Sequence, residues 1–192
     1  MNNADMQSTG FELDLGWRDR IKDFDYGVHL LLSDDRQKIL KYPNTTGKIN
    51  TWYVGKYNGD IWGFETIGIA KSQEEMDAHL ASLPNGGQDA LGVKWGAGDI
   101  MYRDLNGDGK ISDGATLNDP GDKKVIGNTS PRFRFGLDLN ASWKGIDVRL
   151  FFQGVAKRNA WLNDNMFWVA TGGIWQSACF TSHLDFFREE GD

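Results

Sequence analysis

The strongest constraint on the fold is a pair of alternating runs between residues 133 and 152. In the first run, apolar residues occupy every second position: Phe133, Phe135, Leu137, Leu139, Ala141 and Trp143. A second run from Ile146 to Phe152 follows directly after Lys144 and Gly145. An apolar period of two is that of a strand with one apolar face. Two such runs across a two-residue turn predict an antiparallel hairpin.

A second hairpin is predicted nearer the start of the chain. Residues 11–18 alternate, residues 19–23 form a short polar turn, and residues 24–33 alternate again. Each run is about nine to eleven residues long, which is the length that a tilted strand needs to cross a bilayer. Residues 1–10 are polar and are expected to be an irregular start.

Between the two hairpins the alternation is lost. Within this long connection, Ser72 is followed three residues later by Glu75. That spacing is a capping box, which predicts a short helix over residues 72–83. The resulting divisions of the chain are an N-terminal start (1–10), a hairpin (11–33), a long loop region containing the helix (34–98), an Asp/Gly-rich loop (99–130), a second hairpin (131–154) and a further loop region (155–192).

Composition excludes several classes of protein. The chain has 24 Gly, 8 Trp and only 4 Pro, a mixture that favours β-structure with many turns. A net charge of −6 argues against a surface that binds nucleic acid. The single cysteine, Cys179, excludes an internal disulfide and a cysteine-based zinc site. His183 and Asp185 lie near Cys179 in sequence, but nothing in the sequence brings them together as a catalytic pair, so we do not expect an enzyme.

The Asp/Gly-rich loop contains the motif D-x-N-x-D-G-x-I at residues 104–111, which has the spacing of the first part of an EF-hand calcium loop. The candidate Ca²⁺ ligands are Asp104, Asn106, Asp108, the carbonyl of Lys110, and Ser112. Ala115 stands where that loop needs an acid with two coordinating oxygens. Asp113, Asp119 and Asp122 are nearby acids, but none has the required offset.

Two interpretations of this loop therefore remain. In one, it holds a weak structural Ca²⁺ ion that fixes the loop. In the other, it is a cluster of turns in which the side chains accept hydrogen bonds from their own backbone.

Aromatic residues in the loops are candidates for stacking on sugar rings or for gripping a partner. They are Trp52, Tyr53, Trp62, Phe64, Trp161 and Trp168. The alternative is that they pack the loops against each other. The sequence does not select individual ligand-binding residues among them.

Several motifs, in order, resemble the SusC/RagA family of TonB-linked outer-membrane transporters. They are G-F-E-L-D-L-G-W-R (10–18), F-D-Y-G-V-H-L-L-L-S-D (24–34), G-D-I-W-G-F-E-T-I-G-I (59–69), G-D-I-M-Y-R-D-L-N-G-D-G-K-I (98–111), V-I-G-N-T-S-P-R-F-R-F-G-L-D-L (125–139) and W-K-G-I-D-V-R-L-F-F-Q-G (143–154). The resemblance covers residues 10–154 well and the remainder loosely.

The resemblance implies a fold and a function. Such proteins are 22-stranded barrels with an N-terminal plug that import oligosaccharides or peptides, with a SusD-like surface lipoprotein as lid and energy drawn through TonB. This chain would be a C-terminal barrel part without the plug or the TonB-binding segment. The expected fold class is all-β: a partial transmembrane antiparallel β-barrel with long extracellular loops and one short helix, in the outer membrane of a Gram-negative bacterium.

The resemblance also orients the second hairpin. The apolar odd-numbered residues of 133–143 would face outer-membrane lipid, and Arg134, Asp138 and Asn140 would face the lumen. The turn at Lys144 and Gly145 would be periplasmic.

Two other functions remain open on sequence alone. A soluble, calcium-dependent carbohydrate-binding β-module would bury the same apolar faces in a sandwich core. A glycan-processing enzyme would need two suitably spaced acids in a cleft, which the sequence does not show.

Overall fold

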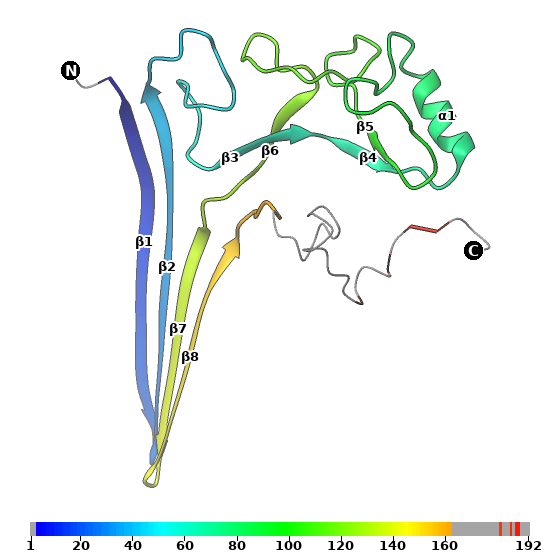
Figure 1. Ribbon diagram of the computed structural model, residues 1–192. Helices are drawn as coiled ribbons and strands as arrows, with labels where there is room; N and C mark the ends of the chain where they lie inside the picture. The colour runs from blue at the N-terminus through cyan, green and yellow to red at the C-terminus, as the bar shows by residue number, and fades with distance from the viewer. Residues whose placement is uncertain (1–2, 163–180, 182–184, 186, 189–192) are drawn as a thin grey trace, which may run out of the picture. The chain divides into compact units, whose positions relative to one another are not determined.

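The computed structural model describes residues 3–162, 181, 185 and 187–188 (Figure 1). The chain divides into two compact units. The first comprises Met1–Thr45, Trp52–Ile61 and Gly127–Ala160, and the second comprises Thr46–Thr51, Trp62–Ile126 and Trp161–Asp192.

The first unit is built on a four-stranded antiparallel sheet. Its strands are β1 (Asp5–Ile21), β2 (Phe24–Lys41), β7 (Arg132–Trp143) and β8 (Ile146–Lys157), in the order β1-β2-β7-β8. The two hairpin turns lie at the same end of this sheet (Figure 1). In the β7–β8 turn, Lys144 and Gly145 have φ angles of 48° and 86°. Positive φ at both central residues matches the right-handed twist of the flanking strands.

The register places apolar side chains opposite one another across all four strands. Leu15 pairs with Leu30, Leu30 with Leu137, and Leu137 with Phe152. Because directly paired residues point to the same side of a sheet, this side is apolar over most of its area. We call it the apolar face; its members are Phe11, Leu13, Leu15, Trp17, Ile21, Phe24, Tyr26, Val28, Leu30, Leu32, Phe135, Leu137, Leu139, Ala141, Trp143, Ile146, Val148, Leu150 and Phe152.

An ion pair ends the pairing of β2 with β7. The last paired residues are Ser33 and Arg134. Beyond them, the guanidinium of Arg132 donates two hydrogen bonds to the buried carboxylate of Asp34. The amide N–H of Phe133, which has a φ of 53°, donates to the same carboxylate at 3.2 Å. Asp34 therefore holds the start of β7 against β2.

A different segment lies along β2 after β7 has left it. The amide of Ile39 donates to the carbonyl of Lys56 at 2.9 Å, and the amide of Asn58 donates to the carbonyl of Gln37 at 2.9 Å. An antiparallel bridge joins Lys38 and Tyr57. At this end of β2, on the side that β7 has left, the backbone hydrogen bonds are therefore made with residues 55–58 and not with another long strand.

The remaining elements are short. They are β3 (Asp60–Phe64), β4 (Thr66–Ile69), α1 (Gln73–Ala81), β5 (Ile100–Tyr102) and β6 (Lys123–Asn128). β3 pairs with β6, and β4 pairs with β5. In the second unit, Ala70, Met76 and Met101 form a small buried core against which Leu80 and Trp95 pack.

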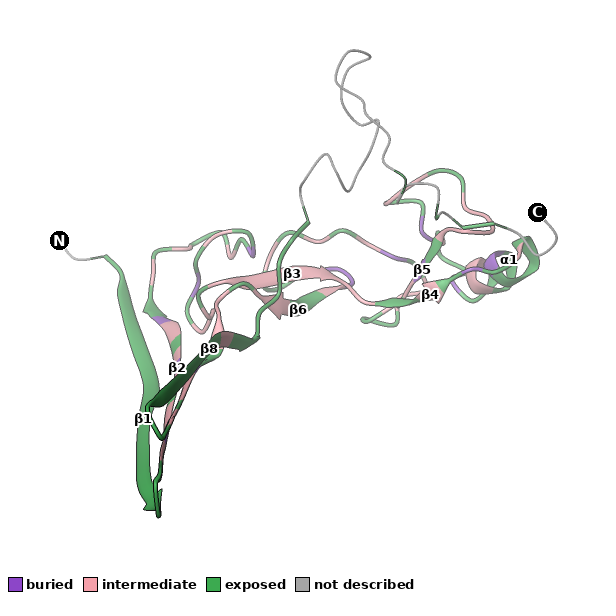
Figure 2. Ribbon diagram, turned by 90° about the horizontal axis from the view of Figure 1, so that it is seen from below, coloured by how far each residue is buried: buried purple, intermediate pink, exposed green. Residues whose placement is uncertain are grey.

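The predicted helix is confirmed and begins as the capping pattern indicates. Ser72 is the N-cap, and its hydroxyl accepts a hydrogen bond from the amide of Glu75 at 3.3 Å. The carboxylate of Glu75 accepts from the amide of Lys71 at 2.7 Å, one residue before the position that a full capping box uses. Met76 is the buried residue of the helix (Figure 2).

The strands extend beyond the predicted hairpins. β1 begins at Asp5, inside the stretch expected to be irregular, and the first turn is only Lys22 and Asp23. β2 continues to Lys41 and β8 to Lys157. The reason is that backbone pairing continues into segments that are mostly polar and whose few apolar residues do not alternate, so the sequence shows no period of two there. The short strands β3 to β6 were likewise not predicted within the loop regions.

The predicted fold class is confirmed: the chain is mostly antiparallel β-structure with one short helix, as expected for part of a barrel wall. Among the described residues, no helix is both long enough and apolar enough to span a membrane.

The β7–β8 turn provides a test of this register. Replacing Gly145 with Ala puts a Cβ on a residue with a φ of 86°, so we expect a loss of about 1–2 kcal/mol in unfolding free energy. Gly16→Ala in β1 is the control, since its Cβ would have its nearest neighbour at 3.8 Å and its φ is not positive. Denaturant unfolding of the folded protein measures both; equal losses would contradict the turn geometry.

Candidate functional site

The two faces of the four-stranded sheet are the most distinctive surfaces of the chain. The apolar face is strongly exposed: the side chains of Trp17 and Ile146 are both 62% accessible to solvent. β1 is exposed along its whole length (Figure 2). An apolar surface of this extent on a soluble protein marks an interaction site, so this face is suited to contact lipid or another apolar surface.

Aromatic rings lie toward both ends of the apolar face. Trp143, Phe24 and Tyr26 lie near the turns, and the Phe24 and Tyr26 rings stack with centroids 5.9 Å apart, whereas Trp17 pairs with Val28 midway along the face. Phe11 lies near the other end. Aromatic residues at the two edges of an apolar band are typical of strands that cross a membrane.

The opposite face carries charge. His29 Nε2 lies 2.6 Å from Asp14 Oδ1, and Arg20 Nε lies 2.6 Å from Asp25 Oδ1. Arg149 forms a bidentate pair with Asp138, with one Nε–Oδ2 contact at 2.9 Å. Exposed pairs of this kind contribute little stability. They do make this face, which we call the polar face, a hydrated surface with fixed donors and acceptors.

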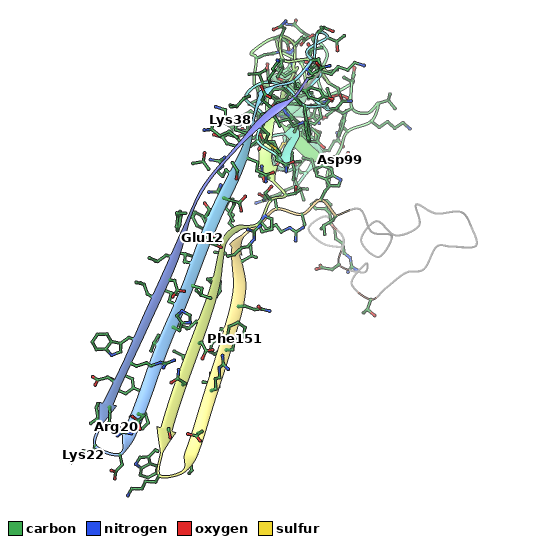
Figure 3. All side chains as sticks on the ribbon, turned by 90° about the vertical axis from the view of Figure 1, so that its left-hand side faces the viewer. Glu12, Arg20, Lys22, Lys38, Asp99 and Phe151 are labelled. Carbon is green, nitrogen blue, oxygen red and sulfur yellow. The ribbon has the colours of Figure 1, made fainter. Side chains whose placement is uncertain are left out.

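One apolar patch interrupts the polar face. A Cβ on Gly136 would lie 3.7 Å from the Leu31 side chain and 3.9 Å from the Phe151 ring. The side chain of Phe151, labelled in Figure 3, is 58% exposed. Gly136 thus leaves room for a ring and an aliphatic side chain within a charged surface, an arrangement that can stack against a sugar ring or an apolar side chain.

The Asp/Gly-rich loop uses its side-chain oxygens to accept backbone hydrogen bonds. Asp104 accepts from the amides of Gly107 at 2.6 Å and Gly109 at 2.8 Å. Asn106 Oδ1 accepts from the amide of Asp108 at 2.9 Å. Asp108 Oδ1 accepts from the amide of Lys110 at 3.1 Å. These are the contacts that the turn interpretation expects.

Asp122 closes the loop, and its role was not predicted. This carboxylate is fully buried and accepts from the amides of Leu105 at 2.7 Å and Ser112 at 2.6 Å. The hydroxyl of Ser112 also donates to it, at 3.2 Å. The predicted ligand Ser112 is thus bound to an acid outside the motif. In the sequence, Asp122 could be noticed only as an acid near the motif, because its spacing matches no known pattern of ligands or turns.

The electrostatics of Asp104 follow from these contacts. Partial burial raises the pKa of Asp104, but hydrogen bonds from the amides of Gly109, Gly107 and Asp108 outweigh it, so the pKa lies below its ordinary value. Among the described residues, no group of three or more His, Cys, Asp or Glu side chains is arranged to hold a metal ion. Calcium binding by the five candidate ligands therefore stays a prediction.

The loop aromatics differ in exposure. Tyr53 is buried, and Phe64 packs against Tyr102 with centroids 5.4 Å apart. Trp52 and Trp161 are exposed, and Trp52 makes an edge contact with Tyr42. Trp168, Cys179 and His183 lie outside the described residues.

Comparison with known proteins yields two relatives of one kind. Over 165 residues, or 80% of this chain, the sequence is 30% identical to TonB-dependent receptor P26 of Formosa agariphila. Over 166 residues, it is 23% identical to TonB-dependent receptor P3 of the same organism. The chain is similar to part of a TonB-dependent receptor. It spans 15% of the length of each relative, and no family model matches it.

Calcium binding by the loop is tested by removing two candidate ligands. If the loop holds Ca²⁺, calcium should raise the melting temperature of wild type but not of the double variant Asp104→Ala with Asp108→Ala, because a bound ion stabilises only the folded protein. In chelator the double variant should already melt below wild type, since it loses the hydrogen bonds that the two carboxylates accept. Asp113→Ala is the control, since Asp113 pairs with Lys123 outside the motif. A calcium-induced shift of the same size in wild type and double variant, or no shift in either, would exclude the site.

Proposed function

We propose that this chain is part of the barrel wall of a TonB-dependent receptor in the outer membrane of a Gram-negative bacterium, and that the receptor imports nutrients. The observation that carries the proposal is the continuous exposed apolar face of the four-stranded sheet, backed by a polar face that carries ion pairs and one apolar patch. Alternating lipid-facing and lumen-facing residues are the pattern of a membrane-spanning barrel strand.

The length of the apolar face fits a bilayer. A tilted strand crosses the hydrocarbon core in about 9–11 residues. On β2 the apolar positions run from Phe24 to Leu32, and on β1 from Phe11 to Ile21. β1 and β2 are longer, at 17 and 18 residues, so they extend past the apolar face at the end away from the turns.

The polar face supports uptake of a hydrophilic substrate, and we propose oligosaccharides or peptides. The ion pairs of the polar face and the exposed ring of Phe151 combine hydrogen-bonding groups with a stacking surface. Both classes of substrate need such a mixture, because each carries many polar groups around small apolar surfaces.

The proposed subfamily is SusC/RagA, with a SusD-like surface lipoprotein as partner and TonB as the source of energy. Support comes from the ordered motifs of residues 10–154 and from the large connection between β2 and β7, which leaves and rejoins the sheet at the end opposite the tight turns. The relatives support only the broader proposal of a TonB-dependent receptor.

A pair of neighbouring leucines tests membrane insertion. Leu30 lies on the apolar face and Leu31 on the polar face of the same strand. An Arg near the middle of the lipid-facing side costs about 2–4 kcal/mol, so we expect Leu30→Arg to reduce the amount of protein assembled in the outer membrane severalfold. Leu31→Arg is the matched control and should assemble nearly normally.

Assembly is measured by quantifying folded protein in isolated outer membranes. A soluble module would show neither variant in that fraction, and equal assembly of both would contradict lipid contact. Trp17 provides an independent readout: brominated lipids should quench its fluorescence, so Trp17→Phe should remove a quenched component that Trp52→Phe leaves in place.

Nutrient uptake is tested by deleting the gene in its host and measuring growth on single oligosaccharides or peptides. We expect growth to fail on one such class, and to fail in the same way when TonB is deleted. A lipoprotein that co-purifies with the protein from outer membranes would support the SusD-like partner. Unchanged growth on every nutrient of both classes would contradict the proposed substrates.

A further inference from the structure

The apolar face changes abruptly into a charged surface at the end away from the turns. After Leu32, the next side chains of β2 on that face are those of Asp34, Arg36 and Lys38, because alternate residues of a strand share a face. On β1, Phe11 pairs with Asp34 in the register. Figure 3 labels Lys38 at this end of the sheet and Lys22 at the turn.

A cavity of about 510 Å³ lies on this charged surface. Its lining residues are Gln7, Thr9, Gly10, Phe11, Asp34, Arg36, Lys38 and Tyr57. The Tyr57 ring centroid lies 3.9 Å from the Arg36 guanidinium carbon and 5.8 Å from the Lys38 nitrogen. These contacts hold both cations beside the ring and fix their positions within the cavity.

The charge of the cavity is positive. Asp34 is the carboxylate in its lining, but Arg132 and the amide of Phe133 already bind both of its oxygens. Within the described part of the chain, Arg36 and Lys38 form no salt bridge. Phe11, half exposed, gives the cavity an apolar edge that is continuous with the apolar face.

We propose that this cavity binds the phosphate of a membrane lipid headgroup whose acyl chains lie along the apolar face. The proposal rests on the proposed membrane insertion of the sheet. Guanidinium and ammonium groups bind phosphate oxygens through charge-assisted hydrogen bonds, and basic residues beside a bilayer attract anionic lipids. Thr9 and Gln7 add neutral polar groups at the rim. The position of the two cations, directly past the last apolar residues, is where a headgroup meets its hydrocarbon chains.

The test uses the protein produced from its whole gene and purified in a zwitterionic detergent. Native mass spectrometry measures the binding of short-chain phosphatidic acid. We expect the double variant Arg36→Gln with Lys38→Gln to bind at least tenfold more weakly than wild type. The control is Lys22→Gln with Lys144→Gln, which removes the same charge from the turn end and should leave the Kd within about twofold. Equal weakening in both double variants would overturn the proposal, because attraction would then follow net charge alone.

Further arms identify the source of the phosphate. Phosphatidylcholine of the same chain length should bind more weakly, since its headgroup has no net charge. Inorganic phosphate should compete only at far higher concentration, because it lacks chains to contact the apolar face. If inorganic phosphate binds as tightly as the lipid, the cavity is a site for free anions and the lipid proposal fails.

Three further variants keep the test decisive if the double variant fails to assemble. Arg36→Lys with Lys38→Arg retains both charges and should retain binding, whereas Arg36→Gln and Lys38→Gln alone should each weaken it about threefold; wild-type affinity in both single variants would overturn the proposal. Outer-membrane assembly is measured for every variant alongside binding. If Leu30→Arg assembles as well as Leu31→Arg, the proposed membrane insertion is wrong. If the cavity variants assemble normally and bind lipid as tightly as wild type, only the headgroup site is wrong.

Discussion

The pairing register of four strands is the constraint on which the rest of the first unit depends. It brings the large apolar side chains of β1, β2, β7 and β8 onto one face, and shifting any strand by one residue would move its apolar set to the other face. Within the described residues of the first unit, no second layer covers this face; its members are largely exposed. A sheet of this kind is stable only where something other than water covers its apolar side.

The same strands serve two environments along their length. As far as Leu32, one face of β2 carries apolar side chains; from Asp34 onward the same face carries charged side chains. The Asp34–Arg132 pair stands at this boundary, where β7 ends its pairing with β2 and residues 55–58 take over the hydrogen bonds. The headgroup proposal and the membrane proposal both derive from this single change in surface chemistry.

Some features were predictable because a local pattern encodes them. Alternation gave the strands within the apolar band, Ser72 and Glu75 gave the helix start, and Lys144 and Gly145 gave the turn. The outer parts of the strands were missed because they are mostly polar and their few apolar residues do not alternate, which leaves no periodic signal. Asp122 was missed because its partners, Leu105 and Ser112, are ten or more positions away, and no spacing rule relates a buried acceptor to distant amides. Pairing of β2 with β7 also has no local signature, since the two strands are distant in sequence.

That distance has a consequence for the order of folding. Each hairpin closes through a two-residue turn and can form within microseconds. Joining them requires contacts such as Asp34–Arg132, which are 98 residues apart in sequence. The entropic cost of closing such a loop grows only slowly with its length, by about 0.6 kcal/mol for each doubling. This cost arises before the contacts between the hairpins have formed and can offset it. The pairing of β2 with β7 should therefore form last. Insertions between these two strands should slow assembly only modestly and should leave the folding rate of each hairpin unchanged.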